Sequence, residues 1–232
     1  MNPLVLLPGM NCTADLWTDA FFRDAHHGAV ITPELREVSI AAQVDALLRD
    51  LPDKFVLAGL SLGGIVAMAL VQAAPERVSG LCVVSTNAKA ATTAQQHGWE
   101  DWIRRLDNGE SARDVQKSIL PVLLSERSRH RLVLENRVLA MAQRTGAERL
   151  RSQLHMQKTR VDLVAGLADV DVPTLVISGT EDGLCPPSYH AEIAAAVPRA
   201  ELISIQAGHL LSMERPEKFR GIVRFWRSRH RI

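Results

Sequence analysis

A serine between two glycines is the feature of this sequence that points most directly to chemistry. Residues 59–63 read Gly-Leu-Ser-Leu-Gly, between a strand-like apolar run at 54–58 and a helix-forming, alanine-rich stretch at 65–74. In a strand–turn–helix context, this pattern places the serine on a sharp turn with its hydroxyl exposed. The glycines leave room for the tight backbone. We therefore predict that Ser61 is a nucleophile, the alternative being a glycine-rich turn with an incidental serine.

A serine nucleophile requires a base, because its hydroxyl reacts poorly at neutral pH. The base is usually a histidine that a carboxylate orients, and both are expected on loops beyond the carboxyl ends of parallel strands. One such loop follows the predicted strand at 173–178 and offers Glu181 and Asp182, of which we favour Asp182. The alternative is that both acids only cap the helix that follows.

The base is predicted in the loop that follows the expected strand at 200–205. His209 is the only one of the eight histidines that comes directly after a predicted strand end. By itself such a histidine is more often structural. The order Ser61, Asp182, His209 is, however, the order expected for a Gly-x-Ser-x-Gly nucleophile with its acid and base. We predict that these three residues form a catalytic triad.

The oxyanion that forms during acyl transfer needs two backbone N–H donors. Leu62 follows the nucleophile at the start of a helix, where N–H groups have no partner within the helix. The second donor is expected from the loop after the first strand, and the N–H of Met10 is the natural candidate.

Five segments together resemble the α/β-hydrolase superfamily over nearly the whole chain. Residues 6–10 are similar to its oxyanion loop, 59–64 to its nucleophile elbow and 75–78 to the stretch after the elbow helix. Residues 173–182 are similar to its acid strand and loop, and 208–217 to its histidine loop and last helix. The resemblance implies the esterase-like branch with a serine nucleophile. The superfamily also includes lactonases, thioesterases, carbon–carbon bond hydrolases and haloperoxidases, and dehalogenases that carry an aspartate at the elbow.

The sequence departs from the family pattern in two places. Family members often have two strands before the oxyanion loop, whereas this chain starts directly on it, so we expect a sheet truncated at one edge. Pro8 stands where many members have histidine, which puts the hydrogen bonds that support the oxyanion loop in question.

Apolar runs alternate with helical stretches, which predicts an α/β fold with a doubly wound, mostly parallel sheet and helices on both faces. About six strands are expected, at 4–7, 29–31, 55–58, 78–85, 173–178 and 200–205. Helices are expected at 13–24, 41–51, 62–74, 188–197 and 217–229.

The stretch from 89 to 169 lacks a convincing strand and predicts an inserted helical cap. About four or five helices are expected there, with clear signals at 126–144 and 147–157. Residues 1–88 and 170–232 then form the α/β-hydrolase core. Such insertions usually shape the substrate pocket and exclude water from it.

Several side chains are candidates for contact with the substrate. We predict that Asn11, Trp17, Asn87, Met141 and Leu210 bind it. Other candidates for the pocket wall share large or polarizable side chains within the expected cap, and the alternative for each is packing between cap helices: Trp99, Trp102, Leu139, His155 and Met156. No arginine pair stands out as a carboxylate clamp, although Arg137, Arg144 or Arg160 could serve.

Composition limits the partners of the chain. Its 232 residues carry a formal net charge of +1, which gives no electrostatic case for nucleic acid or an anionic membrane. The three cysteines show no metal-ligand spacing, and no phosphate loop or dinucleotide fingerprint is present, so we expect no cofactor and no metal. Reduced thiols and the lack of a signal peptide favour a cytoplasmic location. The oligomeric state is left open.

These observations predict a serine hydrolase that cleaves a small carboxylic ester, thioester or lactone through an acyl-enzyme on Ser61. One alternative is a carbon–carbon bond hydrolase that acts on a β-diketone-like compound with the same triad. Another is a ligand-binding protein on this fold that carries the triad without catalysis.

Overall fold

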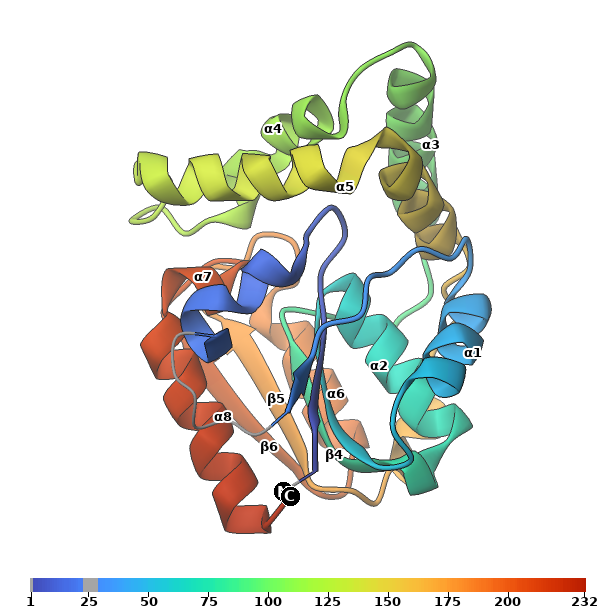
Figure 1. Cartoon of the computed structure of the whole chain (residues 1–232), viewed down its shortest axis with the longest axis vertical. Coiled ribbons are helices and arrows are strands. Elements are labelled where there is room, and N and C mark those ends of the chain that lie inside the picture. The colour runs from blue at the N-terminus through green and yellow to red at the C-terminus, as the bar shows by residue number, and fades with distance from the viewer. Residues whose placement is uncertain (1, 23–28) are drawn as a thin grey trace.

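A six-stranded parallel sheet forms the centre of the computed structural model, which describes residues 2–22 and 29–232 (Figure 1). The strand order is β2-β1-β3-β4-β5-β6, and every neighbouring pair is parallel. This confirms the predicted fold class. The strands are β1 (Leu4–Leu7), β2 (Val30–Ile31), β3 (Phe55–Leu60), β4 (Val78–Val84), β5 (Thr174–Gly179) and β6 (Ala200–Ile205).

Helices cover both faces of the sheet because the strands alternate their side chains between two cores. Leu4 and Leu6 point into one hydrophobic cluster, whereas Val5 and Leu7 point into the other. The first cluster includes residues of α8 (Pro216–His230), the short α7 (Leu211–Glu214) and the turns η1 (Ala14–Trp17) and η2 (Thr18–Phe22). The second includes α1 (Ile40–Asp50), α2 (Leu62–Ala73) and α6 (Pro187–Ala196).

Outside 89–169 the elements begin and end close to where the sequence places them, with one change of type, whereas the helix expected from 126 starts only at Leu132. The helix expected at 13–24 consists of η1, a 3-10 turn, followed by η2, a π-helical turn, and residues 23 and 24 lie outside the described residues. A further 3-10 turn, η3 (Pro75–Arg77), separates α2 from β4, because Pro75 cannot continue the hydrogen-bond ladder of α2.

The chain between β4 and β5 is helical and forms its own layer, which lies beyond one end of the sheet in Figure 1. It contains α3 (Thr93–Asp107), α4 (Ala112–Leu123), α5 (Leu132–Lys158) and the turn η4 (Ala165–Asp169). A separate apolar cluster joins α3, α4 and α5. Gly146, with a φ of 74°, breaks α5 at the point where the sequence predicts two helices.

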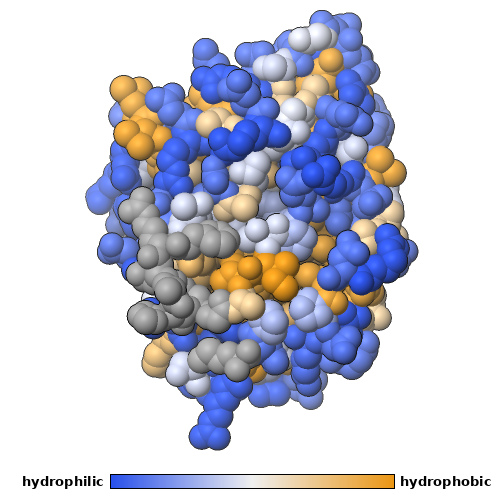
Figure 2. Space-filling model, viewed as in Figure 1, coloured by the Kyte–Doolittle hydropathy of each residue, from blue (hydrophilic) through white to orange (hydrophobic). Residues whose placement is uncertain are grey.

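The surface is largely polar on the face drawn in Figure 2, where hydrophobic residues gather in smaller patches. Among the helices that the structure describes, none combines the length and apolar character that crossing a membrane demands.

The turn between β3 and α2 is pressed against neighbouring backbone. A Cβ atom on Gly59 would lie 2.2 Å from the carbonyl oxygen of Gly63, and one on Gly63 would lie 2.3 Å from that of Leu7. Backbone atoms cannot move aside as the end of a flexible side chain can. Glycine is therefore required at both positions, and α2 starts directly against the end of β1.

We expect Gly59→Ala to lower the free energy of unfolding by about 1–3 kcal/mol or more, because the new methyl group overlaps backbone. Gly98→Ala is the matched control, since Gly98 lies in α3 and a Cβ there meets no atom within 4 Å. The control should stabilise the protein by roughly 0.5–1 kcal/mol. Urea unfolding of both variants measures the difference, and equal stabilities would contradict the packing argument.

Candidate active site

Ser61, Asp182 and His209 each follow the carboxyl end of a strand, namely β3, β5 and β6. Ser61 has φ 56° and ψ −117°, a conformation that residues with a side chain rarely adopt. Its side chain makes no capping hydrogen bond to α2, although it occupies the N-cap position. The hydroxyl is thus not used to cap the helix that it precedes.

Asp182 and His209 form a buried pair. Nδ1 of His209 lies 3.0 Å and 2.9 Å from the two carboxylate oxygens of Asp182, and both residues are about 95% buried or more. Oδ1 of Asp182 also accepts the N–H groups of Leu184 and Cys185, each at 2.9 Å. Glu181, the other acid of this loop, is exposed. The structure therefore brings Asp182, and not Glu181, to the histidine.

The electrostatics of Asp182 favour its ionised form. Burial by itself raises the pKa of this carboxyl, but the charge and hydrogen bond of His209 and the two backbone N–H donors outweigh it, so the pKa falls below the usual value. An ionised Asp182 accepts a hydrogen bond from the N–H at Nδ1 of His209. The proton of the neutral ring is then on Nδ1, so Nε2 is the nitrogen that can take up a proton.

Ser61 and His209 line the same two pockets, and Met10 lines both as well. The first, which we call the small pocket, has a volume of about 40 Å³ and mainly apolar walls that include Leu60, Ile119, Leu123 and Leu210. The second, the large pocket, has a volume of about 190 Å³ and more polar walls. Besides Ser61 and His209, its polar and aromatic side chains include Thr86, Asn87, Gln95, Trp99, Trp102, Gln157 and Arg160.

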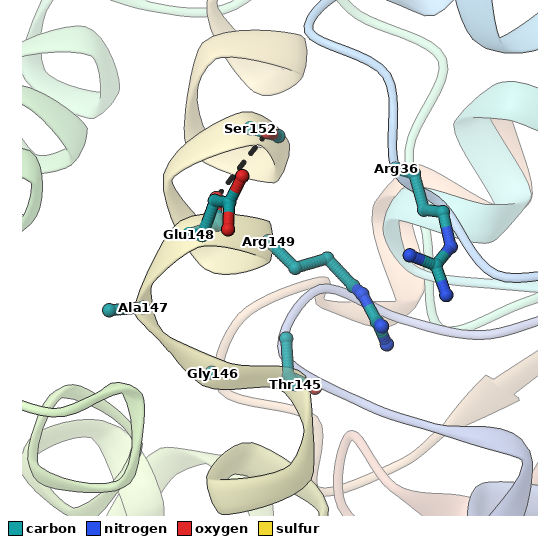
Figure 3. Close-up of a pocket in the computed structure, with 7 residues that line it drawn as sticks. All are labelled: Arg36, Thr145, Gly146, Ala147, Glu148, Arg149 and Ser152. Atoms are coloured by element: carbon teal, nitrogen blue, oxygen red, sulfur yellow. Dashed lines mark hydrogen bonds between the residues drawn. The ribbon is translucent and has the colours of Figure 1, made fainter.

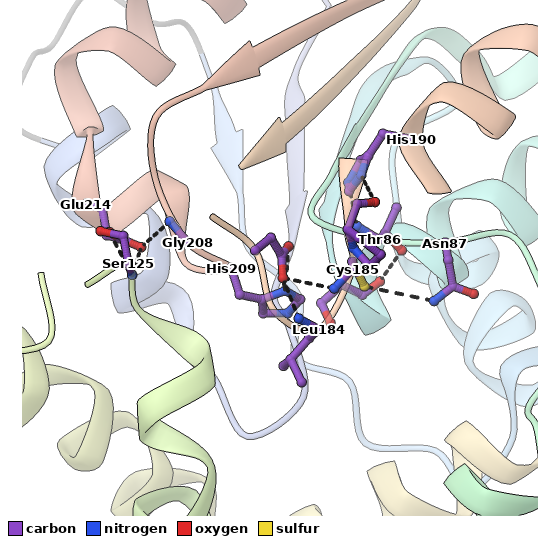
Figure 4. A network of polar contacts seen from close by, with 12 residues as sticks. Thr86, Asn87, Ser125, Leu184, Cys185, His190, Gly208, His209 and Glu214 are labelled. Carbon is purple, nitrogen blue, oxygen red and sulfur yellow. Dashed lines mark hydrogen bonds and ion pairs between the residues drawn. The ribbon is translucent and has the colours of Figure 1, made fainter. Parts of the chain in front are cut away.

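A buried glutamate holds the loop of His209 against the end of α4 (Figure 4). Oε1 of Glu214 accepts the N–H of Gly208 at 2.9 Å, and the Glu214 carboxylate also accepts the N–H and hydroxyl of Ser125. The N–H of Leu210 donates to the carbonyl of Leu123 at 3.1 Å. Residues on both sides of His209 are thus fixed to the helical layer.

A second polar network, which includes Thr86 and His190 (Figure 4), supports the turn of Ser61. The hydroxyl of Thr86 donates to the carbonyl oxygen of Ser61 at 2.8 Å, and the N–H of Thr86 donates to Nε2 of His190 at 3.0 Å. Burial lowers the pKa of His190, which keeps the ring neutral and its Nε2 free to accept. Thr86 and His190 did not emerge from the sequence, because they belong to no motif and meet only in the folded chain.

The candidate oxyanion donors lie beside Ser61. Leu62 is the first residue of α2, where N–H groups lack partners within the helix, and Met10 lines both pockets. The loop of Met10 is fixed through Asn11, which has a φ of 57°. The N–H of Asn11 donates to Gln153 in α5 at 2.8 Å, and its side-chain amide donates to the carbonyl of Ala112 and to Gln116 in α4. These bonds hold the loop of Met10, the candidate oxyanion loop, in a chain that has Pro8 in place of histidine.

The predicted substrate-binding residues fall into two groups. Asn87 lines the large pocket and Leu210 the small one. Asn11, Trp17 and Met141 are not among the residues lining either pocket, because each is buried in packing: Trp17 stacks on Phe219 with ring centres 5.9 Å apart, and Met141 lies in the core. Asn11 instead connects its loop to α4 and α5, and Trp17 and Met141 belong to the hydrophobic core.

The other wall candidates divide in the same way. Trp99, Trp102 and Arg160 line the large pocket. Leu139 and Met156 are buried in packing and His155 is exposed, and none of these three is among the residues that line the two pockets.

Asp182, Cys185 and His209 also place donor atoms within 4.8 Å of one another, a spacing compatible with a metal ion. Their chemistry fits one poorly. Burial raises the pKa of the Cys185 thiol to about 12, whereas a metal ligand must be a thiolate. Nδ1 of His209 already binds the carboxylate that a metal would need. We interpret the cluster as an acid–base pair beside an inert thiol.

A more voluminous cavity, of about 380 Å³, lies away from these residues at the break in α5 (Figure 3). Its lining includes Arg36, Gly146, Glu148 and Arg149, and none of the three proposed catalytic residues. Both arginines are paired with Glu34. Despite its larger volume, this cavity is therefore not the candidate active site.

A family model described as the alpha/beta hydrolase family matches residues 4–222. The chain is 26% identical to the pimeloyl-[acyl-carrier protein] methyl ester esterase of Yersinia enterocolitica, over 95% of this chain and 91% of that protein. It is 28% identical to the protein of the same name from Pectobacterium carotovorum, over 79% of this chain and 77% of that protein.

Two solved structures show the same fold. A thermophilic esterase from Thermogutta terrifontis matches with a TM-score of 0.90 at 24% identity, covering 99% of this chain and 90% of that chain. The enol-lactonase from Burkholderia xenovorans matches with a TM-score of 0.86 at 20% identity, covering 98% and 91%.

The lowered pKa of Asp182 leads to a prediction about stability and pH. The ionised carboxylate stabilises the fold fully above its ordinary pKa of 3.8, and this contribution is lost as the pH falls through the lower folded-state pKa. Asp182→Asn should therefore unfold at a lower urea concentration than the unmodified protein at about pH 7, with a difference that shrinks as the pH approaches about 3. Glu181→Gln is the control, and its exposed side chain should change stability by less than about 0.5 kcal/mol at either pH. The same pH dependence in both variants would refute the assignment.

Proposed function

Because the chain belongs to the alpha/beta hydrolase family, we propose that it hydrolyses carboxylic esters with Ser61 as nucleophile, His209 as base and Asp182 as the residue that orients the base. The observation that carries this proposal is the buried Asp182–His209 pair, whose His209 lines the same two pockets as Ser61, a serine on a strained turn. The curated relatives support the choice of an ester, since their names describe methyl ester esterases.

In the first half-reaction, Oγ of Ser61 attacks the acyl carbon while Nε2 of His209 takes the hydroxyl proton. The negative charge moves to the former carbonyl oxygen, where the N–H groups of Met10 and Leu62 bind it. The C–O bond to the alcohol then breaks, and His209 returns its proton to the leaving oxygen. The products of this step are the free alcohol and an acyl group on Ser61.

In the second half-reaction, Nε2 of His209 takes a proton from water, which attacks the acyl carbon. The oxyanion forms and collapses again, the acid leaves, and Ser61 recovers its proton. Asp182 accepts the hydrogen bond from Nδ1–H throughout and stabilises the imidazolium that forms in each half-reaction.

The two pockets suggest how an ester lies across Ser61. The smaller substituent occupies the small pocket, whose volume of about 40 Å³ suits a group such as methyl, and the larger one occupies the large pocket of about 190 Å³. Helices α3, α4 and α5 supply much of the wall, through Trp99, Ile119 and Gln157 among others. In this proposal residues 89–169 act as a cap over the core formed by 1–88 and 170–232, and the substrate is a small molecule.

Ser61→Ala should reduce kcat for a short p-nitrophenyl ester by roughly 10⁴- to 10⁶-fold, because the acyl-enzyme can no longer form. Its circular dichroism and melting temperature should stay close to those of the unmodified protein. Ser188→Ala, at an exposed serine of α6, is the control and should keep full activity.

A fluorophosphonate probe gives an independent measurement. It should label the unmodified protein and the control variant at Ser61, as intact-protein mass and peptide mapping will show. Hydrolysis that persists in Ser61→Ala would overturn the assignment of the nucleophile. A protein that neither takes up the probe nor cleaves the ester would instead fit a binding protein.

A further inference from the structure

Arg160 is a buried cation in the wall of the large pocket. It lies just after the end of α5 and is only 7% exposed. Its Nη2 donates to Oδ1 of Asn87 at 2.7 Å and to the carbonyl of Lys89 at 2.8 Å, and its Nη1 donates to Oε1 of Gln157 at 3.3 Å. Every one of these acceptors is neutral.

The other two arginines considered from the sequence differ in this respect. Arg137 is paired with Asp19 and Arg144 with Asp15. Within residues 2–22 and 29–232, no carboxylate forms an ion pair with Arg160, and its Nε–H is buried without an acceptor. Its guanidinium lies 5.7 Å from the ring centre of Trp99, a contact that orients the group and leaves its charge uncompensated.

The described residues that line the large pocket supply no negative charge. No aspartate or glutamate is among its lining residues, and Asp182 is engaged with His209. Lys89, whose carbonyl accepts a hydrogen bond from Arg160, has its ammonium group in an ion pair with Glu192 at 2.9 Å. Burying an unpaired charge is costly, and burial lowers the pKa of Arg160, yet arginine stays protonated in proteins. The pocket therefore favours an occupant that brings a negative charge.

We propose that the large pocket binds a carboxylate of the substrate through Arg160, so that the preferred substrate is a half-ester of a short dicarboxylic acid. This rests on the proposed function, with the ester at Ser61 and a small alkoxy group in the small pocket. Among the described residues that line the large pocket, Arg160 is the one arginine or lysine, and a single guanidinium suits a monovalent carboxylate better than a doubly charged phosphate. Asn87 and Gln157 act as positioning residues that hold the guanidinium at the wall.

The test compares two methyl esters of equal size. Monomethyl glutarate carries a free carboxylate, and methyl glutaramate carries a neutral amide in its place. The monomethyl esters of succinic and adipic acid, each with its amide counterpart, cover the neighbouring chain lengths. We expect the unmodified protein to favour an acid over its amide by about 10- to 100-fold in kcat/KM, as one charge-assisted hydrogen bond predicts.

The readout for the variants is the acid-to-amide ratio of kcat/KM. In Arg160→Gln this ratio should fall to about one, and Arg160→Lys should keep part of the preference because it keeps the charge. Arg144→Gln is the control, since Arg144 is half exposed, pairs with Asp15 and should leave the ratio unchanged. Equal kcat/KM for acid and amide in the unmodified protein, or a preference that survives in Arg160→Gln, overturns the proposal.

A second measurement does not depend on whether the Arg160 variants fold. Glutarate should inhibit hydrolysis of p-nitrophenyl acetate by the unmodified protein at least tenfold more strongly than glutaramide, and equal inhibition would overturn the proposal. If the neutral ester is cleaved and neither preference appears, the proposed function stands and this inference fails. If no ester is cleaved and Ser61 takes up no fluorophosphonate, the proposed function fails and this inference with it.

Discussion

The backbone of Ser61 is the constraint on which the rest of the site depends. A left-handed φ at a residue with a side chain costs of the order of 1–3 kcal/mol and persists only where the surroundings enforce it. Here Gly59 and Gly63 allow backbone to approach backbone, and the hydroxyl of Thr86 holds the carbonyl of Ser61. The strained turn directs the side chain of Ser61 to the pockets and places the first free amide of α2 next to it. The proposed nucleophile and the proposed oxyanion donor thus share one structural cause.

The parallel sheet brings the remaining groups to this turn, and the helical layer fixes them there. β1, β3, β5 and β6 end at the same edge, so their following loops meet. Glu214 then connects the loop of His209 to Ser125, and Asn11 connects the loop of Met10 to α4 and α5. Both connections join these loops to the segment between β4 and β5, at α4, α5 and the residue Ser125 just after α4. We infer that the geometry of the proposed triad depends on this layer as well as on the sheet.

The site is divided into a small apolar pocket and a larger pocket with more polar walls, and this division distinguishes the two ends of the proposed substrate. Ser61 and His209 lie between them, so the two substituents of an ester meet different surroundings. Arg160 adds a charge to one side only. An asymmetric site of this kind favours one orientation of the bound ester over the other.

The sequence by itself determined the order of strands and helices and the residues proposed for chemistry. Ser61, Asp182 and His209 could be proposed from the sequence because short motifs and strand ends depend on local backbone preferences. The sequence could not tell that Trp17 and Met141 are packed in the core, or that Arg137 and Arg144 have carboxylate partners while Arg160 has none. Those facts depend on contacts between residues far apart in the chain, such as the bond of Asn11 to Gln153, which are 142 positions apart. Only the folded chain decides them, because burial and charge pairing are properties of neighbours in space.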